Sequence, residues 1–374
     1  MDLIKFPMSK GMHIELQDAE LVQNWATATW AERYFESGEF TLTADTSSGL
    51  EDQLPLKTII SHTGTNETMI VEDIQITTSV DESDKITVTG RSFETFLENR
   101  IVGSNRDWNN PVYPLQDVVI PLDRACFQAA ELINIHIRSG YSLFDNTNGI
   151  NNIAATIIGG LATESRSGLE KERVIKRGDV YKELIDILRE NNLGIRSTRN
   201  SQTDTLYLEI HRGLDLSRSV SFSDDFGEIE SADYLKTTRA QKNAVLVSGK
   251  FVEVAGYDSA HQGYDRRWMF VDASDVDGQL SESPTGPELT RIRQVMGARG
   301  QQALARQNFV SIMNPKLAKG KSRYKYREDY NVGDIVSVNG KYNSSTRMRV
   351  TEFVEVSDET GESSYPTLTD LQEN

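Results

Sequence analysis

Cysteine is nearly absent from this sequence, which restricts the chemistry that the chain can perform. The 374 residues include one cysteine, Cys126, so no disulfide can form within the chain. A structural zinc site is also disfavoured, because such sites need Cys and His ligands at close spacing and the five histidines are scattered. Nothing in the composition requires an oxidising compartment, and we expect folding in a bacterial cytoplasm.

Long apolar runs are absent as well. The longest, roughly residues 153–162, is far too short to cross a bilayer, and residues 1–10 contain no apolar core of a signal peptide. We therefore expect no stable insertion into a membrane. Apolar residues make up 37% of the chain and charged residues 26%, a balance that is typical of folded domains and excludes global disorder.

Positive charge is in deficit. The chain has 56 acidic and 40 basic residues, which gives a formal net charge of −16. A surface that grips nucleic acid needs clustered Lys and Arg to displace counterions from phosphate, so this composition disfavours such a surface. An acidic wall repels phosphate and is compatible with a conduit through which DNA passes without adhering.

Alternating apolar and polar residues predict strands in the first hundred residues and again after residue 204. Phe40 and Leu42, for example, alternate with polar neighbours. A continuous apolar run at 244–247 predicts a strand that is covered on both faces. Residues 347–368 predict a C-terminal hairpin around a polar turn.

Helical spacing of apolar residues predicts three longer helices, at 123–139, 179–194 and about 287–307. Asp179 is expected to cap the second, and Ser92 to cap a shorter helix that follows the early strands. We therefore predict a β-rich α+β fold with an α+β unit inserted between two β-rich parts. The predicted domains are 1–105 (completed by 205–240), 106–204, and 241–374 with the helix near 287–307.

Catalytic groupings are not evident. Cys126 and His136 lie ten residues apart on one predicted helix, about 15 Å of rise, so they cannot form a nucleophile–base pair. Four carboxylates within residues 224–230 are the candidates for a glycosidase-like pair, but in so acidic a chain such clusters more often mark a solvated turn. We predict no catalytic, metal or cofactor-binding residues.

Residues 30–42 resemble the N-terminal signature of a family of minor tail proteins from long-tailed (siphovirus) bacteriophages. That signature has an aromatic residue, an Arg-Tyr-aromatic-Glu run, a turn glycine and a Phe-x-Leu strand. From the residues alone, this block predicts two strands joined by a turn whose geometry Gly38 supplies, with the aromatic residues in core packing rather than at an interface. The matching positions are Trp30, Arg33, Tyr34, Phe35, Gly38 and Phe40.

Further segments resemble the same family in sequence order, and together they span nearly the whole chain. Each segment alone consists of ordinary strand and turn chemistry. The sequence departs from the family pattern at 275–286 and 316–330. The remaining signature positions, which are structural or interface candidates, are Gly90, Arg91, Lys242, Asn243, Gly333, Asp334, Tyr365 and Pro366.

The resemblance implies a hub protein at the tail tip. Each chain would contribute two tail-tube-like antiparallel β-barrel domains with the inserted α+β unit, and three chains would close into a ring of pseudo-six-fold symmetry. A closed ring would also cover exposed strand edges. The implied partners are two further copies in a homotrimer, the distal tail protein ring and tail tube, tail fibre or tip proteins and the C-terminus of the tape measure protein, with DNA only in transit. The implied location is the virion's tail tip, after synthesis in the cytoplasm of the bacterial host.

Two other functions stay open. A carbohydrate-binding receptor protein at the tail tip would expose aromatic platforms, for which Trp25, Trp108 and Trp268 are candidates. A tail-associated hydrolase of cell wall or polysaccharide would need a further domain with a carboxylate pair or a zinc motif. The structural hub, a conduit or closure for DNA ejection, is the function that we expect.

Overall fold

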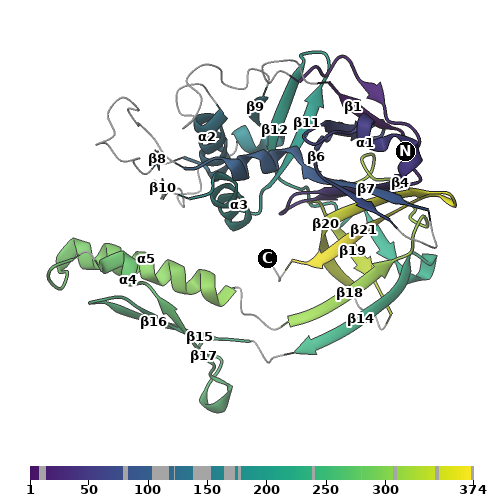
Figure 1. Ribbon diagram of the computed structural model, residues 1–374. Coiled ribbons are helices and arrows are strands. Elements are labelled where there is room, and N and C mark those ends of the chain that lie inside the picture. Colours follow the sequence, from purple (N-terminus) through teal and green to yellow (C-terminus); the bar gives the residue numbers. More distant parts are fainter. Residues whose placement is uncertain are drawn as a thin grey trace, which may run out of the picture. The chain divides into compact units, whose positions relative to one another are not determined.

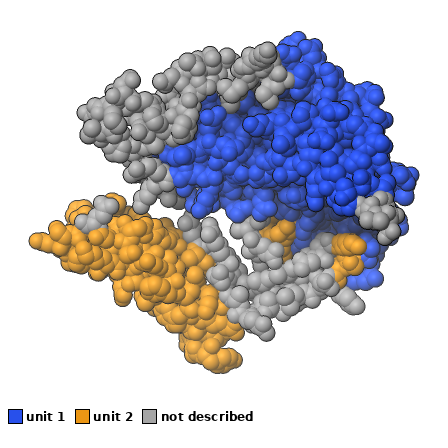
Figure 2. Space-filling model, in the orientation of Figure 1, with its two compact units in different colours: residues 1–230, 317–368 blue, residues 231–316, 369–374 orange. Residues whose placement is uncertain are grey.

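The structure is a computed structural model of the chain (Figure 1). It divides into two compact units, which Figure 2 shows in different colours: unit 1 comprises residues 1–230 and 317–368, and unit 2 comprises residues 231–316 and 369–374. Each unit is described by itself. The residues that the structure describes are 1–7, 14–78, 83–102, 118–121, 123–137, 153–163, 173–175, 178–237, 241–278, 280–305, 310–341 and 345–371.

Unit 1 is built on a large mixed sheet to which both ends of the sequence contribute. Its order is β13-β19-β20-β3-β4-β7-β6-β5-β1-β2, and β21 pairs with β20 outside this path. The pairing of β13 with β19 is parallel, whereas β20 pairs with β3 in antiparallel fashion. The strands are β1 (Leu3–Phe6), β2 (Glu20–Leu21), β3 (Thr27–Arg33), β4 (Glu39–Asp45), β5 (Ile59–His62), β6 (Met69–Thr77), β7 (Lys85–Ser92), β13 (Ser221–Ser223), β19 (Ile335–Asn339), β20 (Ser345–Asp358) and β21 (Gly361–Asp370).

Period-two patterning sets the buried face of this sheet. Phe40 and Leu42 on β4 are each 1% exposed and pack with Trp30 and Val88 in one apolar core, so the strands predicted from their alternation are confirmed. The C-terminal hairpin is confirmed as β20 and β21. Short helical segments on this part of the chain are η1 (Thr46–Ser48), α1 (Leu50–Gln53), η2 (Phe93–Asn99) and η4 (Asp224–Phe226).

A smaller α+β layer belongs to the same unit. The sheet β11-β12-β9 comprises Gly194–Asn200, Thr205–His211 and Ile153–Ile157, and its apolar face shares a core with helices α2 (Ala125–Ile137) and α3 (Val180–Glu190). As predicted, the Asp179 carboxylate caps α3, accepting from the Lys182 backbone N–H at 3.1 Å. The other elements here are β8 (Val118–Ile120) paired with β10 (Arg173–Ile175), and η3 (Gly159–Thr163).

Unit 2 contains a three-stranded sheet and one long helix. The sheet order is β16-β15-β17, and helix α5 packs on the face that carries Val245 and Val247. A two-stranded ribbon pairs β14 with β18. The elements are β14 (Ile229–Thr237), β15 (Ala244–Ser248), β16 (Glu253–Tyr257), η5 (Gly263–Asp265), β17 (Trp268–Asp272), α4 (Ser274–Asp277), α5 (Gly286–Ala305) and β18 (Val310–Leu317).

Several expectations need correction. The β-rich α+β class is observed, but the described strands do not close into barrels, because the order of the large sheet has two ends, β13 and β2. Residues 317–368 lie in unit 1 rather than with 241–316, because β20 pairs with β3. Ser92 does not cap η2 with its side chain; its Oγ accepts from the Gly38 N–H at 2.8 Å. None of the helices in the described ranges combines the length and apolar composition that a membrane span requires.

Two glycines of α5 differ in what surrounds them, and this difference predicts opposite effects of alanine. A Cβ at Gly297 would meet open space, whereas a Cβ at Gly300 would lie 2.8 Å from Val247 Cγ2 and 3.1 Å from Val245 Cγ1. We expect Gly297→Ala to raise the free energy of unfolding by about 0.5–1 kcal/mol and Gly300→Ala to lower it. Urea denaturation of the two variants tests this, and a destabilising Gly297→Ala would contradict the packing of α5.

Candidate functional site

A polar cavity of about 810 Å³ lies within unit 1, on the sheet β11-β12-β9. The register aligns Arg196 with Glu209 and Thr156, and these three side chains line the cavity. The opposite face of the sheet carries Leu206 and Leu208, which are fully buried in the core with α2 and α3. The alternation of the strands therefore separates a dry face from a polar face, and the polar face forms one wall of the cavity.

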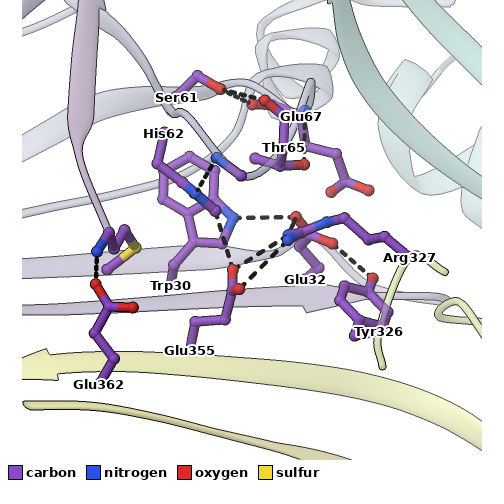
Figure 3. A network of polar contacts seen from close by, with 12 residues as sticks. Trp30, Glu32, Ser61, His62, Thr65, Glu67, Tyr326, Arg327, Glu355 and Glu362 are labelled. Atoms are coloured by element: carbon purple, nitrogen blue, oxygen red, sulfur yellow. Dashed lines mark hydrogen bonds and ion pairs between the residues drawn. The ribbon is translucent and has the colours of Figure 1, made fainter. Parts of the chain in front are cut away.

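Glu32 supplies a buried carboxylate to another wall (Figure 3). It lies on β3, is 2% exposed, and accepts hydrogen bonds from Trp30 Nε1 at 3.3 Å, Tyr326 Oη at 2.6 Å and Arg327 Nη2 at 2.6 Å. Burial, together with the adjacent Glu32 charge, raises the pKa of Tyr326, so its hydroxyl stays a donor. The buried charge is therefore both hydrogen-bonded and paired, as burial of a carboxylate requires.

Arg327 extends this network to β20 and β5. Its Nη1 and Nη2 donate to Glu355 at 3.3 and 3.2 Å, and His62 Nε2 lies 3.0 Å from Glu355 Oε2. Burial acts to raise the pKa of Glu355, but His62 and Arg327 outweigh it and hold the pKa at about 2. The stabilisation from this carboxylate is therefore full above its unfolded pKa near 4.3 and is lost as the pH falls toward 2.

Glu67 and Arg199 line the same cavity but, unlike Glu32 and Arg327, have no oppositely charged partner among the described residues. Within the described ranges no hydrogen bond or ion pair reaches the Glu67 carboxylate, which Figure 3 shows outside the dashed network. Burial and then the Glu32 charge raise its pKa well above the ordinary value. Arg199 donates to the Thr65 carbonyl at 3.2 Å and Ser201 Oγ at 3.3 Å, without a carboxylate partner among the described residues, and burial lowers its pKa.

Glu94 on η2 lies close enough to add to the electrostatic repulsion at Glu67, and it predicts a pH dependence of stability. It is 1% exposed, and burial raises its pKa to about 7. Because the folded pKa is raised, its stabilisation is full below about pH 4.3 and is lost as the pH rises through 7. We expect the free energy of unfolding to fall by about 3 kcal/mol between pH 5 and pH 9, and Glu94→Gln to remove most of that fall. Urea denaturation at each pH measures both, and identical pH profiles would contradict this role of Glu94.

Four of the predicted signature residues meet at one junction of unit 1. Tyr34 Oη donates to the Asn192 carbonyl at 2.9 Å, and the Tyr34 and Phe35 rings meet edge to face at 4.6 Å between centroids. Gly333, at φ +99°, packs against the Tyr34 ring. The buried Asp334 accepts from the Leu214 backbone N–H at 2.6 Å. The junction packs the end of β3 against segments near residues 192, 214 and 333, so these four signature residues have a packing role.

The other signature residues of the large sheet form separate contacts. Trp30 and Phe40 stack in the core at 6.2 Å between centroids. Arg33 pairs with Glu39 and Glu352, and Arg91 pairs with Glu72 and Glu98, all between 2.6 and 2.8 Å. These contacts join neighbouring strands and a nearby helix end, and they do not converge on a reactive centre.

Gly38 and Gly90 are needed for close approach of backbones. Gly38 lies in the connection between β3 and β4 and is not among the described residues with positive φ, so a left-handed backbone does not explain the glycine there. A Cβ at Gly38 would lie 2.4 Å from the Ala31 carbonyl oxygen, and a Cβ at Gly90 would lie 1.8 Å from the Ile70 carbonyl oxygen. Gly90 pairs with Val71 beside the register shift in β6.

The last four signature residues are distributed over both units. In unit 2, Asn243 Nδ2 donates to the Asp265 carbonyl at 2.7 Å and its Oδ1 accepts from the Arg267 N–H at 2.7 Å; the adjacent Lys242 is half-buried. In unit 1, Pro366 is buried, and the Lys319 ammonium lies 5.2 Å from the centroid of the half-buried Tyr365 ring. The signature residues therefore do not form one site.

Sequence reasoning missed the polar network, although one signal for it was present. Glu32 occupies the same face of β3 as Ala28 and Trp30, both fully buried, so an acid stands at a core position. Such a residue needs a cationic or donor partner. No local pattern could identify Arg327 as that partner, because 295 residues separate the two.

The residues weighed for catalysis have structural contacts. Glu228 is 1% exposed and accepts from Arg323 Nε at 3.1 Å and from the Ser223 N–H at 3.0 Å. Cys126 lies on α2, is buried in the core of unit 1, and its Sγ donates to the Leu161 carbonyl at 3.9 Å. Across the described ranges, no three His, Cys, Asp or Glu side chains gather as metal ligands.

The sheet of unit 2 exposes aromatic side chains. Its register places Tyr257, Ala244 and Trp268 in one row, and Phe270 follows in the next row on the same face. Tyr257 is 58%, Trp268 46% and Phe270 66% exposed. These side chains belong to the flanking strands β16 and β17; on β15 itself Ala244 is buried and Leu246 half-buried on this face, so the predicted cover of the 244–247 strand is confirmed for Ala244 and only partial at Leu246. Of the other candidate platforms, Trp25 packs half-buried against the core of unit 1, and Trp108 lies outside the described residues.

Comparison with known proteins gives a family and a fold. The sequence matches the family model described as Siphovirus ReqiPepy6 Gp37-like protein over residues 14–137 and 146–368. The structure is similar to the crystal structure of the prophage MuSo2 43 kDa tail protein from Shewanella oneidensis, with a TM-score of 0.58 and 12% identity, over 100% of this chain and 99% of that one. No curated protein matches the sequence.

Two further solved structures have a similar fold. Prophage tail protein gp18 from Listeria monocytogenes EGD-e aligns with a TM-score of 0.54 and 9% identity, over 100% of this chain and 96% of that one. A tail protein from Neisseria meningitidis MC58 aligns with a TM-score of 0.53 and 12% identity, over 94% of each chain. At these identities the similarity establishes a shared fold.

Proposed function

The chain belongs to the family of Siphovirus ReqiPepy6 Gp37-like proteins, and on that premise we propose that it is the structural hub at the distal end of a long-tailed phage tail. The proposal makes it a phage tail protein and a component of the virion tail, which the family and the tail-protein fold support. In the proposed role it joins the tail tube and the hexameric distal tail protein to the three-fold tip or fibre. It also forms the conduit or closure for DNA ejection, without catalysing a reaction.

The observation that carries this proposal is the extent of the match. The family model covers both β-rich parts and the layer between them, and the prophage MuSo2 tail protein aligns over 100% of this chain and 99% of its own. Both matches extend over nearly all of this chain rather than over one part of it, which supports a single structural role for it. The net charge of −16 supports passage of DNA without adhesion.

A homotrimer is part of the proposal. In the described part of unit 2, β16 and β17 are the outer strands of a three-stranded sheet, and one face of that sheet is aromatic and exposed. Open edges and apolar faces are features that assemblies cover. Light scattering of the chain mixed with its distal tail protein should give a complex with three copies of this chain per ring. A complex with one or two copies would contradict the homotrimer.

A second candidate function, carbohydrate binding at the tail tip, is favoured by the exposed aromatic face. Tyr257 and Trp268 meet at 6.5 Å between centroids, and sugar rings stack on such aromatic surfaces. If this function holds, Trp268→Ala should reduce binding to purified host polysaccharide about tenfold or more, without a change in stability beyond about 0.5 kcal/mol. Tyr264→Ser, which removes a 99% exposed ring outside the sheet, is the control. If the wild-type chain does not bind the polysaccharide, the carbohydrate-binding function is contradicted and only the structural role remains.

A further inference from the structure

The walls of the cavity in unit 1 carry six Glu or Arg side chains, and four of them are paired with one another. Arg327 Nη2 pairs with Glu32 at 2.6 Å, and Arg196 Nε pairs with Glu209 at 2.9 Å. The remaining two are Glu67 and Arg199. The described residues give the Glu67 carboxyl group no cation within ion-pair distance and give Arg199 no carboxylate, so one acid with a raised pKa and one guanidinium line the cavity without an oppositely charged partner.

Both groups have capacity for a ligand. The Glu67 carboxylate offers two acceptor oxygens, and partial burial beside Glu32 makes it unfavourable as an isolated charge. A guanidinium has five N–H donors, and Arg199 uses three of them on Ser61, Ser201 and Thr65, so 5 − 3 leaves two. A ligand with a cationic group and a carboxylate would therefore pair with groups that the cavity leaves unpaired.

The rest of the lining suits a polypeptide backbone. Asn66, Gln202 and Asn331 contribute side-chain amides with donors and an acceptor that can match peptide groups. Asn200 contributes its amide donors, because its Oδ1 already accepts from the Gln202 and Thr203 N–H groups. The volume of about 810 Å³ is within the range of ligand sites and equals that of roughly 27 water molecules, enough for several residues. A neutral saccharide could use the amides but would leave Glu67 and Arg199 without an oppositely charged partner.

We propose that this cavity binds an extended polypeptide segment of mixed charge. A Lys or Arg side chain of the segment pairs with Glu67, an Asp or Glu side chain pairs with Arg199, and the amides hold the backbone between them. The segment comes from a second copy of this chain or from another tail protein, since the chemistry of recognition is the same for both. This binding is independent of the trimeric hub and can be measured without assembled tails.

Acetylated and amidated hexapeptides, with one Arg and one Asp separated by two or three neutral residues in either order, are suitable probes. Calorimetric titration into the full chain should show binding of the peptides that have Arg and Asp in one of the two orders. Glu67→Gln and Arg199→Gln should each weaken this binding about tenfold or more, because each variant loses a charge-assisted pair. Asp215→Asn, which breaks the exposed pair with Arg347 outside the cavity, should leave binding unchanged. Peptides with Gln and Asn in place of Arg and Asp should bind at least as weakly as the variants.

The two sources of the segment can be separated in the same preparations. If the Glu67→Gln, Arg199→Gln double variant reduces self-association of the chain, the segment belongs to a second copy; if self-association is unchanged while peptide binding is lost, it belongs to another tail protein. Both results support the cavity as a peptide site. The proposal is overturned if no probe binds the wild-type chain at millimolar concentration, or if both single variants bind as well as the wild type. Neither result would bear on the trimeric hub.

Discussion

Arg327→Met is expected to lower the free energy of unfolding by about 3–5 kcal/mol. The methionine keeps most of the side-chain volume but removes the cation that pairs with Glu32 and Glu355. Glu32 is 2% exposed, so its charge would stay buried with hydrogen bonds from Trp30 and Tyr326 alone. Urea denaturation followed by tryptophan fluorescence measures the loss, and Trp30 lies within the network.

The control for this prediction is Arg347→Met. Arg347 pairs with Asp215 on the surface, where both side chains are about half exposed, so its loss should change stability by less than about 1 kcal/mol. Adding Glu32→Gln to Arg327→Met should restore part of the loss, because the uncompensated charge is removed. Equal effects of Arg327→Met and Arg347→Met would contradict a buried network that ties the 326–327 segment to β3.

Gly333→Ala is expected to destabilise the chain by about 3–5 kcal/mol. The residue has φ +99°, which an alanine adopts only with strain, and its Cβ would lie 2.3 Å from Tyr34 Cε2. The Tyr34 ring cannot move away easily, because a Cβ at Gly194 would also lie 2.5 Å from it and its hydroxyl is bonded to the Asn192 carbonyl. Denaturation of the purified variant measures the cost.

Gly49→Ala separates the two contributions to that cost. Gly49 also has positive φ, at +70°, but its Cβ would meet nothing within 4 Å, so we expect a loss of about 1–2 kcal/mol from backbone strain alone. The excess at Gly333 reports the contact with Tyr34. If the two substitutions were equally destabilising, the junction would not be tightly packed, and the signature residues Tyr34 and Gly333 would need another explanation.

Local patterns in the sequence predicted the elements that depend on neighbouring residues. The alternation around Phe40 identified β4, and the capping carboxylate of Asp179 identified the start of α3. The spacing of apolar residues also located α5 near 287–307. In these cases the deciding interactions lie within a few positions along the chain, so composition and period are sufficient.

Features that depend on distant pairing could not be predicted in the same way. No local signal joins β20 to β3, which moves residues 317–368 into unit 1. Gly38 was assigned a turn role because its neighbours are turn residues, whereas contact with the Ala31 carbonyl explains the glycine. The uncompensated state of Glu67 and Arg199 likewise depends on side chains from several separate segments, and it follows only from the three-dimensional arrangement.

The central claim, that this chain is the tail hub, is tested most directly by electron microscopy of virions labelled with antibodies against the chain, together with its copy number per particle. We predict label only at the end of the tail away from the capsid, and three copies in each virion. Label along the tail tube or at the capsid, or a copy number other than three, would contradict the hub.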